Sequence, residues 1–153
     1  MGHQDELLRI ALALKKGSDY FSSGWNVNFL QAFIRDGGNC VYCGREVMSE
    51  FCVASGDHLL PRRFYPALAE SVDNLVAACA YCNVVKKDYD PSEKKGMEIV
   101  LTEPVRQKLI DKSREEIIRR KREYERGFET DKAAFTEAIA EYRRCSPRTA
   151  YLL

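Results

Sequence analysis

Two pairs of cysteines in this chain of 153 residues have the spacing of metal ligands. Each pair encloses two residues, in the segments Cys40-Val-Tyr-Cys43 and Cys79-Ala-Tyr-Cys82. This spacing lets both sulfur atoms of a pair converge on one ion, and two pairs supply the four thiolates of a tetrahedral structural zinc site. The alternatives are a disulfide framework or core cysteines that bind nothing. We predict zinc, because the motif occurs twice and each pair is followed by a turn or a helix start.

The other two cysteines, Cys52 and Cys145, have no partner at metal spacing. We predict a small buried strand residue at Cys52 and an incidental thiol at Cys145. Six cysteines without a secretory signal favour a reducing compartment, where paired cysteines bind metal more often than they form disulfides. We therefore expect a cytoplasmic protein.

The segment between the two cysteine pairs holds further residues that could do chemistry. It is 35 residues long, whereas simple zinc ribbons have roughly 15 to 20 residues there. The segment contains Asp57-His58, and His3 is the only other histidine of the chain. An imidazole exchanges protons near neutral pH, so His58 is the candidate general base, and the adjacent carboxylate could help to hold a divalent cation.

Four short segments, taken together, resemble the HNH endonuclease family in their order and approximate spacing. They are CVYCG at 40–44, DHLLP at 57–61, DNLV at 73–76 and CAYCNVVKKD at 79–88. The resemblance covers roughly residues 39–92 and implies a ββα-metal fold with a zinc clamp at its base. Many members have a histidine where this chain has Asn83, so the chain looks like an H-N-N version of the family.

The resemblance implies a role for each residue of the motif. His58 would activate the water that attacks the scissile phosphate, and Asn74 would hold the loop that bears His58 and orient its ring. Asp57 and Asn83 would bind one divalent ion, Mg²⁺ or Mn²⁺, through a carboxylate and an amide oxygen. An amide oxygen suits a hard ion better than an imidazole does. In the alternative interpretation, Asn74 is a turn residue that bonds its own backbone.

Four basic residues near these positions are candidates for phosphate contacts. Arg62 and Arg63 follow the Asp-His pair, and Lys86 and Lys87 follow Asn83. Such contacts would contribute affinity without sequence choice. The alternative is that they are solvated surface charges. The net charge of +1 does not decide between these readings, because binding depends on where basic residues cluster.

The rest of the chain must position these residues, and its pattern predicts three stretches. Residues 1–38 are expected to form an N-terminal helical segment, and their first 17 residues read as an amphipathic helix and not as a signal peptide. Residues 39–96 are expected to form the metal-bound core. In this core a hairpin bends at Gly56 and a short helix starts near Cys79, so that Cys79, Cys82 and Asn83 share one side.

Residues 97–153 are expected to form a C-terminal helical extension. We predict a helix from Thr102, an interruption at Gly127, and a final helix near residues 135–142. Residues 106–126 hold nine Lys or Arg against five Asp or Glu. Such a helix could touch phosphates, and the alternative is a solvated face with internal ion pairs. For four aromatic residues we favour packing over base stacking, namely Tyr42, Phe64, Tyr65 and Tyr81.

The sequence therefore predicts an α+β, mainly helical protein whose small zinc-bound ββα-metal core lies between N-terminal and C-terminal helices. We expect a metal-dependent nuclease that hydrolyses DNA, with RNA left open as a substrate, acting as a monomer or a homodimer. No apolar run approaches the ~20 residues needed to cross a bilayer, so we expect no membrane partner. The alternative is a zinc-ribbon-like module that binds nucleic acid or protein without catalysis.

Overall fold

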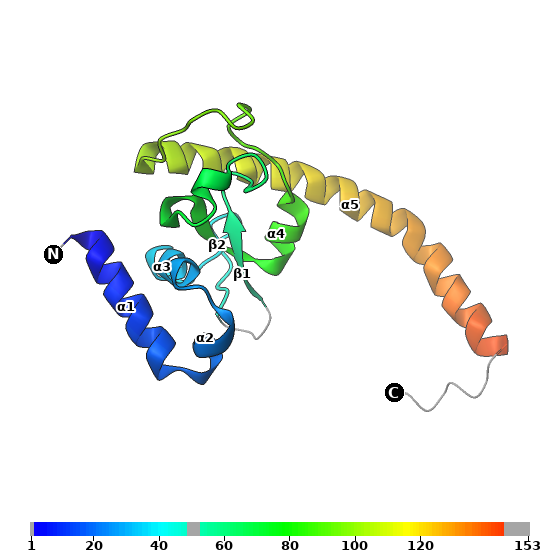
Figure 1. Cartoon of the computed structure of the whole chain (residues 1–153). Helices are drawn as coiled ribbons and strands as arrows, with labels where there is room; N and C mark the ends of the chain where they lie inside the picture. Colours follow the sequence, from blue (N-terminus) through cyan, green and yellow to red (C-terminus); the bar gives the residue numbers. More distant parts are fainter. Residues whose placement is uncertain (1, 49–52, 146–153) are drawn as a thin grey trace. The chain divides into compact units, whose positions relative to one another are not determined.

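The structure is a computed structural model that describes residues 2–48 and 53–145 (Figure 1). It contains a small two-stranded sheet among helices, so the predicted mainly helical α+β class is confirmed. The chain divides into two compact units, residues 1–117 and residues 118–153. Among the described residues, no helix has both the length and the apolar character to span a membrane. The predicted setting of Cys52 lies outside the described residues.

The expected N-terminal helices are present as α1 (His3–Gly17), α2 (Asp19–Gly24) and α3 (Val27–Arg35). Ser18 begins α2 by accepting a hydrogen bond from the backbone N–H of Phe21, and Asn26 caps α3 by accepting one from Asn28. Such side-chain acceptors satisfy N–H groups that have no partner within a helix. The buried face of α1 is narrower than its run of leucines suggests, because Leu8 and Leu12 are exposed.

The sheet consists of β1 (Ala54–His58) and β2 (Leu75–Cys79), which pair antiparallel. The predicted hairpin at Gly56 is wrong, since Gly56 lies in the middle of β1, opposite Ala77. Gly56 does not form a turn; its missing side chain lets Phe29 lie close to the strand. A Cβ atom at this position would lie 2.1 Å from Cδ1 of Phe29, whose ring rests on the strand.

The connection from β1 to β2 includes two short 3₁₀ helices, η1 (Pro66–Leu68) and η2 (Val72–Asn74). Directly after β2 the chain enters α4 (Ala80–Lys86), where the sulfur of Cys79 accepts a hydrogen bond from the backbone N–H of Cys82. The predicted order of strand, strand and helix is therefore confirmed. It places the second cysteine pair at the first turn of α4.

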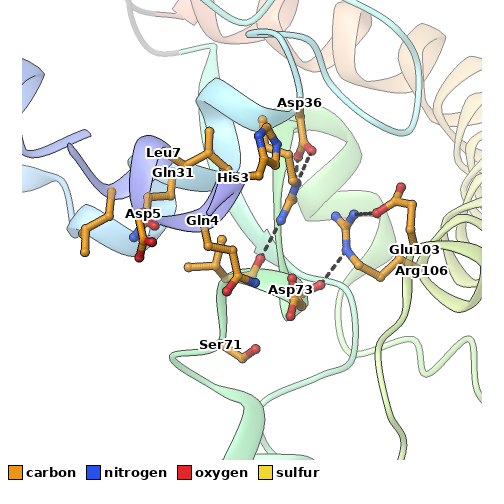
Figure 2. A pocket seen from close by; sticks show the side chains of 13 residues that line it. His3, Gln4, Asp5, Leu7, Gln31, Asp36, Ser71, Asp73, Glu103 and Arg106 are labelled. Atoms are coloured by element: carbon orange, nitrogen blue, oxygen red, sulfur yellow. Dashed lines mark hydrogen bonds and ion pairs between the residues drawn. The ribbon is translucent and has the colours of Figure 1, made fainter. Parts of the chain in front are cut away.

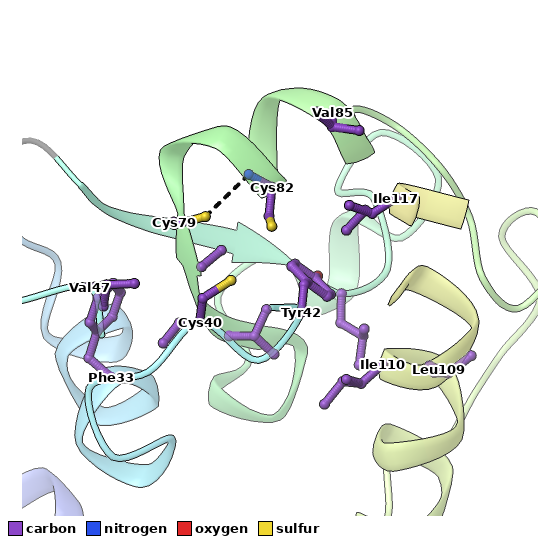
Figure 3. Close-up of a cluster of buried hydrophobic side chains, with 14 of the residues drawn as sticks. Phe33, Cys40, Tyr42, Val47, Cys79, Cys82, Val85, Leu109, Ile110 and Ile117 are labelled. Atoms are coloured by element: carbon purple, nitrogen blue, oxygen red, sulfur yellow. Dashed lines mark hydrogen bonds between the residues drawn. The ribbon is translucent and has the colours of Figure 1, made fainter. Parts of the chain in front are cut away.

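The core surrounds β2, which is buried along its whole length (Figure 3). Strands that are covered on both sides read as continuous apolar runs, as Leu75–Ala78 does. The elements on either side of the sheet contribute Phe33 from α3 and Leu109, Ile110 and Ile117 from the last helix. The flanking helices thus supply part of the core that the two cysteine pairs enter.

The last helix, α5 (Glu103–Cys145), is continuous, so the predicted interruption at Gly127 is wrong. A glycine within a helix lowers helix stability by about 1 kcal/mol relative to alanine. This loss is small enough for the turns on either side to keep the helix continuous. Ion pairs within the helix join Arg119 to Glu123 and Lys121 to Glu125. This pattern is typical of a solvated face.

Replacing Gly56 by alanine should destabilise the sheet, because the added methyl group must displace the ring of Phe29. Overpacking of this kind costs roughly 1–3 kcal/mol, which urea unfolding followed by circular dichroism would measure. The matched control is Gly127→Ala, because a Cβ atom there has nothing within 4 Å. An alanine at position 56 that leaves the unfolding midpoint unchanged would contradict the close approach.

Candidate functional site

The four predicted cysteines converge in the structure. The sulfur atoms of Cys40, Cys43, Cys79 and Cys82 all lie within 4.8 Å of one another, and those of Cys43 and Cys79 are 3.8 Å apart. A tetrahedron with Zn–S bonds of about 2.3 Å has edges of about 3.8 Å. The predicted cluster is confirmed, and its size fits a zinc ion.

The first pair is held by a tight backbone loop. The backbone N–H of Cys40 donates to Arg45 O, and that of Gly44 donates to Cys40 O, each at 2.8 Å. Gly44 has a φ of 75°, a conformation that glycine adopts readily. The loop is tied to the sheet by a hydrogen bond from Val41 N to Ala77 O at 3.0 Å. The tight loop and its hydrogen bond to β2 together place the first cysteine pair beside the second pair, which follows β2 in the chain.

The electrostatics of the cluster also favour a bound cation. A hydrogen bond from Cys82 lowers the pKa of the Cys40 thiol to about 5. The same contact, followed by burial, raises the pKa of Cys82, and burial raises the pKa of Cys43. One thiolate therefore opposes the ionisation of its neighbours. Four thiolates in this space require a positive ion among them.

Asp57 lies in a buried polar contact at the end of β1. Its Oδ2 atom accepts a hydrogen bond from the Tyr42 hydroxyl at 2.6 Å and lies 3.0 Å from Nζ of Lys86. Burial, followed by the charge of Asp57, raises the pKa of Tyr42. The tyrosine therefore stays protonated and donates. The second oxygen of Asp57, Oδ1, has no hydrogen bond to any of the described residues.

Lys86 does not lie on the surface, where a phosphate contact was expected. Its side chain is fully buried, with Nζ on Asp57 and 2.9 Å from the carbonyl oxygen of His58. A buried ammonium requires such partners, because an unpaired charge in the interior is strongly unfavourable. A phosphate outside the protein cannot reach Nζ of Lys86 in this position, so the predicted phosphate contact at Lys86 is wrong.

Asn83 lies one turn before Lys86 on α4 and contacts the same strand. Its Nδ2 atom donates to Ser55 Oγ at 2.8 Å and to Gly56 O at 3.2 Å. A carbonyl oxygen can only accept, so the amide nitrogen faces β1. The amide oxygen is then the part of Asn83 that can ligate a cation, and it has no hydrogen bond within the described part of the chain.

His58 closes β1, and its ring is held on two sides. The Nε2 atom lies 2.9 Å from Ala69 O, and the ring meets Phe29 edge-on with 5.7 Å between centroids. Because Ala69 O can only accept, the proton of the neutral ring resides on Nε2. The other nitrogen, Nδ1, therefore keeps its lone pair and is the atom that can accept a proton.

Asn74 is fully buried and clamps the connection that follows His58. Its Oδ1 atom accepts from Leu60 N at 2.8 Å, and its Nδ2 atom donates to Leu60 O at 3.0 Å and Leu68 O at 3.2 Å. These bonds join the residues just after β1 to the residue that precedes Ala69. The interpretation of Asn74 as a residue that bonds only its own turn does not describe these contacts.

The other three candidate phosphate contacts, Arg62, Arg63 and Lys87, are exposed. Arg63 pairs with exposed Asp88 at 3.0 Å and its guanidinium lies over the ring of Phe64. Exposed ion pairs contribute about 0–1 kcal/mol, so such a partner can be exchanged for another anion.

Asn83 and Lys86 of α4 thus hold consecutive parts of β1, the strand that bears Asp57 and His58. Tyr42 and Phe29 belong to this site and were not predicted for it. For Tyr42 the sequence offered only its place inside the first cysteine pair. For Phe29 it offered no signal, because its contact with His58 depends on how α3 packs.

The family comparison agrees with this geometry. A family model described as HNH endonuclease matches residues 40–88, which run from the first cysteine of the cluster to the turn after α4. Comparisons with curated proteins and with solved structures gave no significant match.

Loss of one ligand should unfold the core. We expect Cys79→Ser to lose zinc and to melt without cooperativity, because a structural zinc site contributes about 10–16 kcal/mol against a total stability of roughly 5–15 kcal/mol. Metal analysis after dialysis and thermal melting would measure both effects. Cys145→Ser is the matched control, since Cys145 is exposed on α5. Zinc content and melting that match those of the parent would contradict the assigned ligand.

Removing the buried ammonium should leave an uncompensated carboxylate inside. We expect Lys86→Met to lower the free energy of unfolding by about 3–5 kcal/mol, whereas Lys87→Met, at the exposed neighbour, should change it by less than about 0.5 kcal/mol. Chemical denaturation of the zinc-loaded protein would compare the two variants. Equal, small losses would show that the ion pair with Asp57 does not form in solution.

Proposed function

We propose that this protein is a metal-dependent nuclease that hydrolyses phosphodiester bonds in DNA, because a family model described as HNH endonuclease matches residues 40–88. In this proposal His58 is the general base, Asn74 holds the connection that orients it, and Asp57 and Asn83 bind one Mg²⁺ or Mn²⁺ ion. Zinc is held by the four-cysteine cluster and is structural.

The observation that carries the proposal is the hydrogen bond of His58 to Ala69 O. It leaves Nδ1 as the proton acceptor of a neutral ring, which is the state a general base needs before it takes a proton from water. The same strand end carries Asp57, and Asn83 holds that strand from α4. The base and the two oxygen ligands of this proposal therefore lie on β1 and on the helix that is bonded to it.

The oxygen atoms available there suit a hard divalent ion. Tyr42 and Lys86 both use Oδ2 of Asp57, so Oδ1 is left for a metal, together with the amide oxygen of Asn83. Two protein oxygens with water and substrate phosphate are a usual shell for Mg²⁺. When bound, the ion neutralises negative charge on the phosphate. The buried Lys86 holds Asp57 in place without occupying both of its oxygens.

The substrate would be retained by exposed basic residues. Arg62, Arg63 and Lys87 are the candidates for backbone phosphate contacts, and such contacts make binding sensitive to salt. Because one site cuts one strand, cleavage of both strands requires a second copy or a second encounter. A monomer or a homodimer in the cytoplasm, as expected from the sequence, is part of the same proposal.

A plasmid-nicking assay tests this function. The zinc-loaded parent should nick supercoiled DNA when Mg²⁺ or Mn²⁺ is added, and His58→Ala should reduce the rate by about 10²–10⁴-fold, the usual contribution of a general base. Zinc content and thermal melting should stay at the parent values. His3→Ala is the matched control, because His3 is the other histidine and lies exposed at the start of α1.

Two outcomes would contradict the proposal. Equal rates for the parent and His58→Ala would remove His58 from the mechanism. Salt-sensitive DNA binding by the parent without cleavage at any divalent ion concentration would favour the alternative, a module that binds nucleic acid without catalysis.

A further inference from the structure

The backbone that holds His58 is itself held by side chains from outside the HNH region. Five carbonyl oxygens between Leu68 and Asp73, here called the carbonyl segment, each accept a hydrogen bond from a side chain. The donors are Asn74 Nδ2 to Leu68 O (3.2 Å), His58 Nε2 to Ala69 O (2.9 Å), Asn28 Nδ2 to Glu70 O (3.0 Å), Arg35 Nη1 to Val72 O (2.7 Å) and Arg106 Nε to Asp73 O (2.7 Å). The remaining carbonyl, Ser71 O, accepts from the backbone N–H of Asn74.

Three of these donors lie outside residues 40–88. Asn28 and Arg35 belong to α3 and Arg106 belongs to α5, so two helices that are distant in sequence fix the same six-residue stretch. Figure 2 shows Arg106 with its bonds to Asp73 and Glu103 at the wall of a cavity. The proposed catalytic and metal-binding residues do not line this cavity.

The two arginines are fixed and not loosely placed. The Arg106 side chain is 4% exposed and pairs with Glu103 at 2.8 Å, and Arg35 pairs with Asp36 at 2.8 Å. Arg35 also donates from Nη2 to Leu75 O at 2.7 Å, at the start of β2. A planar guanidinium with several bonds holds its acceptors in a defined orientation. The carbonyl segment therefore has little freedom to turn its peptide groups.

The orientation of the Ala69 carbonyl decides which nitrogen of His58 carries the proton. Asn28 of α3 donates to the carbonyl oxygen of Glu70, the residue after Ala69. A side chain of α3 therefore holds the peptide group next to the one that His58 contacts. The next residue on α3, Phe29, forms the other wall of the histidine ring. Both sides of the ring thus depend on α3.

We propose that Asn28, Arg35 and Arg106 are positioning residues that hold His58 as its Nε2–H tautomer by fixing the carbonyl segment. The effect on catalysis rests on the proposed function, whereas the effect on the ring does not. On this basis the flanking helices complete the active site, because the segment they hold is the part of the domain that orients the base.

The test is the tautomer of His58 in the zinc-loaded full chain, measured without substrate at mildly alkaline pH by long-range proton–nitrogen correlation spectra. The parent should show mainly the Nε2–H form. Asn28→Asp, which replaces the donor by an acceptor, should give a mixture of tautomers, as should Arg35→Lys and Arg106→Lys. In the cleavage assay, kcat should fall by about 10-fold, as for other supporting residues of active sites, with KM within about twofold and unchanged zinc content.

The chain offers matched controls for both kinds of substitution. Asn26→Ser keeps a helix-capping oxygen and removes the bond from the Asn26 amide to the Glu70 side chain without adding a charge, so the ring signals should not change. Arg114→Lys alters an α5 arginine whose Nε also donates to a carbonyl at 2.7 Å, but that carbonyl is Val41 O. Its ring signals should likewise match those of the parent.

Asn28→Asp keeps the test decisive if an arginine variant fails to fold, because an acidic residue in the first turn of α3 is favourable for the helix. Parent-like tautomer populations in Asn28→Asp and in the folded arginine variants would overturn the proposal. A shifted tautomer in a protein whose parent does not cleave DNA would support the positioning role and refute the proposed function. The two can therefore fail separately.

Discussion

Four thiols converge at the start of α4, and the small sheet and the candidate site are built around them. Two strands of five residues each do not form a stable unit in water, and the residues that bear the chemistry lie at the ends of these strands. The cluster ties the loop at Cys40–Cys43 to the junction between β2 and α4, and a hydrogen bond from Val41 joins the same loop to β2. The helix that presents Asn83 is thereby fixed at its first turn.

A second constraint acts at the other end of α4. Lys86 is fully buried and binds both the Asp57 carboxylate and the His58 carbonyl, so the helix is attached to β1 by a charge that has no access to water. The same oxygen of Asp57 also accepts a hydrogen bond from Tyr42, which belongs to the cysteine loop. The four-cysteine cluster and the candidate catalytic site are therefore connected through one tyrosine and one helix. A substitution that displaces Tyr42 or α4 in one of these sites therefore alters the geometry of the other.

The flanking helices give the small core what it cannot provide alone. Leu109, Ile110 and Ile117 of α5 and Phe33 of α3 complete the apolar cluster around β2. The same two helices hold the backbone between Leu68 and Asp73, to which His58 is bonded. Packing and orientation thus come from the same elements, which explains why residues outside the family match lie against the candidate site.

The cysteine cluster and the order of strand, strand and helix could be predicted from the residues alone, and His58 could be named as the candidate base, because these depend on spacing and on residue chemistry. The sequence placed Gly56 in a turn, Gly127 at a break and Lys86 on the surface, and the structure differs at all three. Each outcome depends on a distant partner or on the continuity of a helix: Phe29 against Gly56, uninterrupted hydrogen bonds through Gly127, and Asp57 beside Lys86. Only tertiary structure decides which side chains lose contact with water and which distant carbonyl faces a histidine, since burial and long-range hydrogen bonds have no local signature.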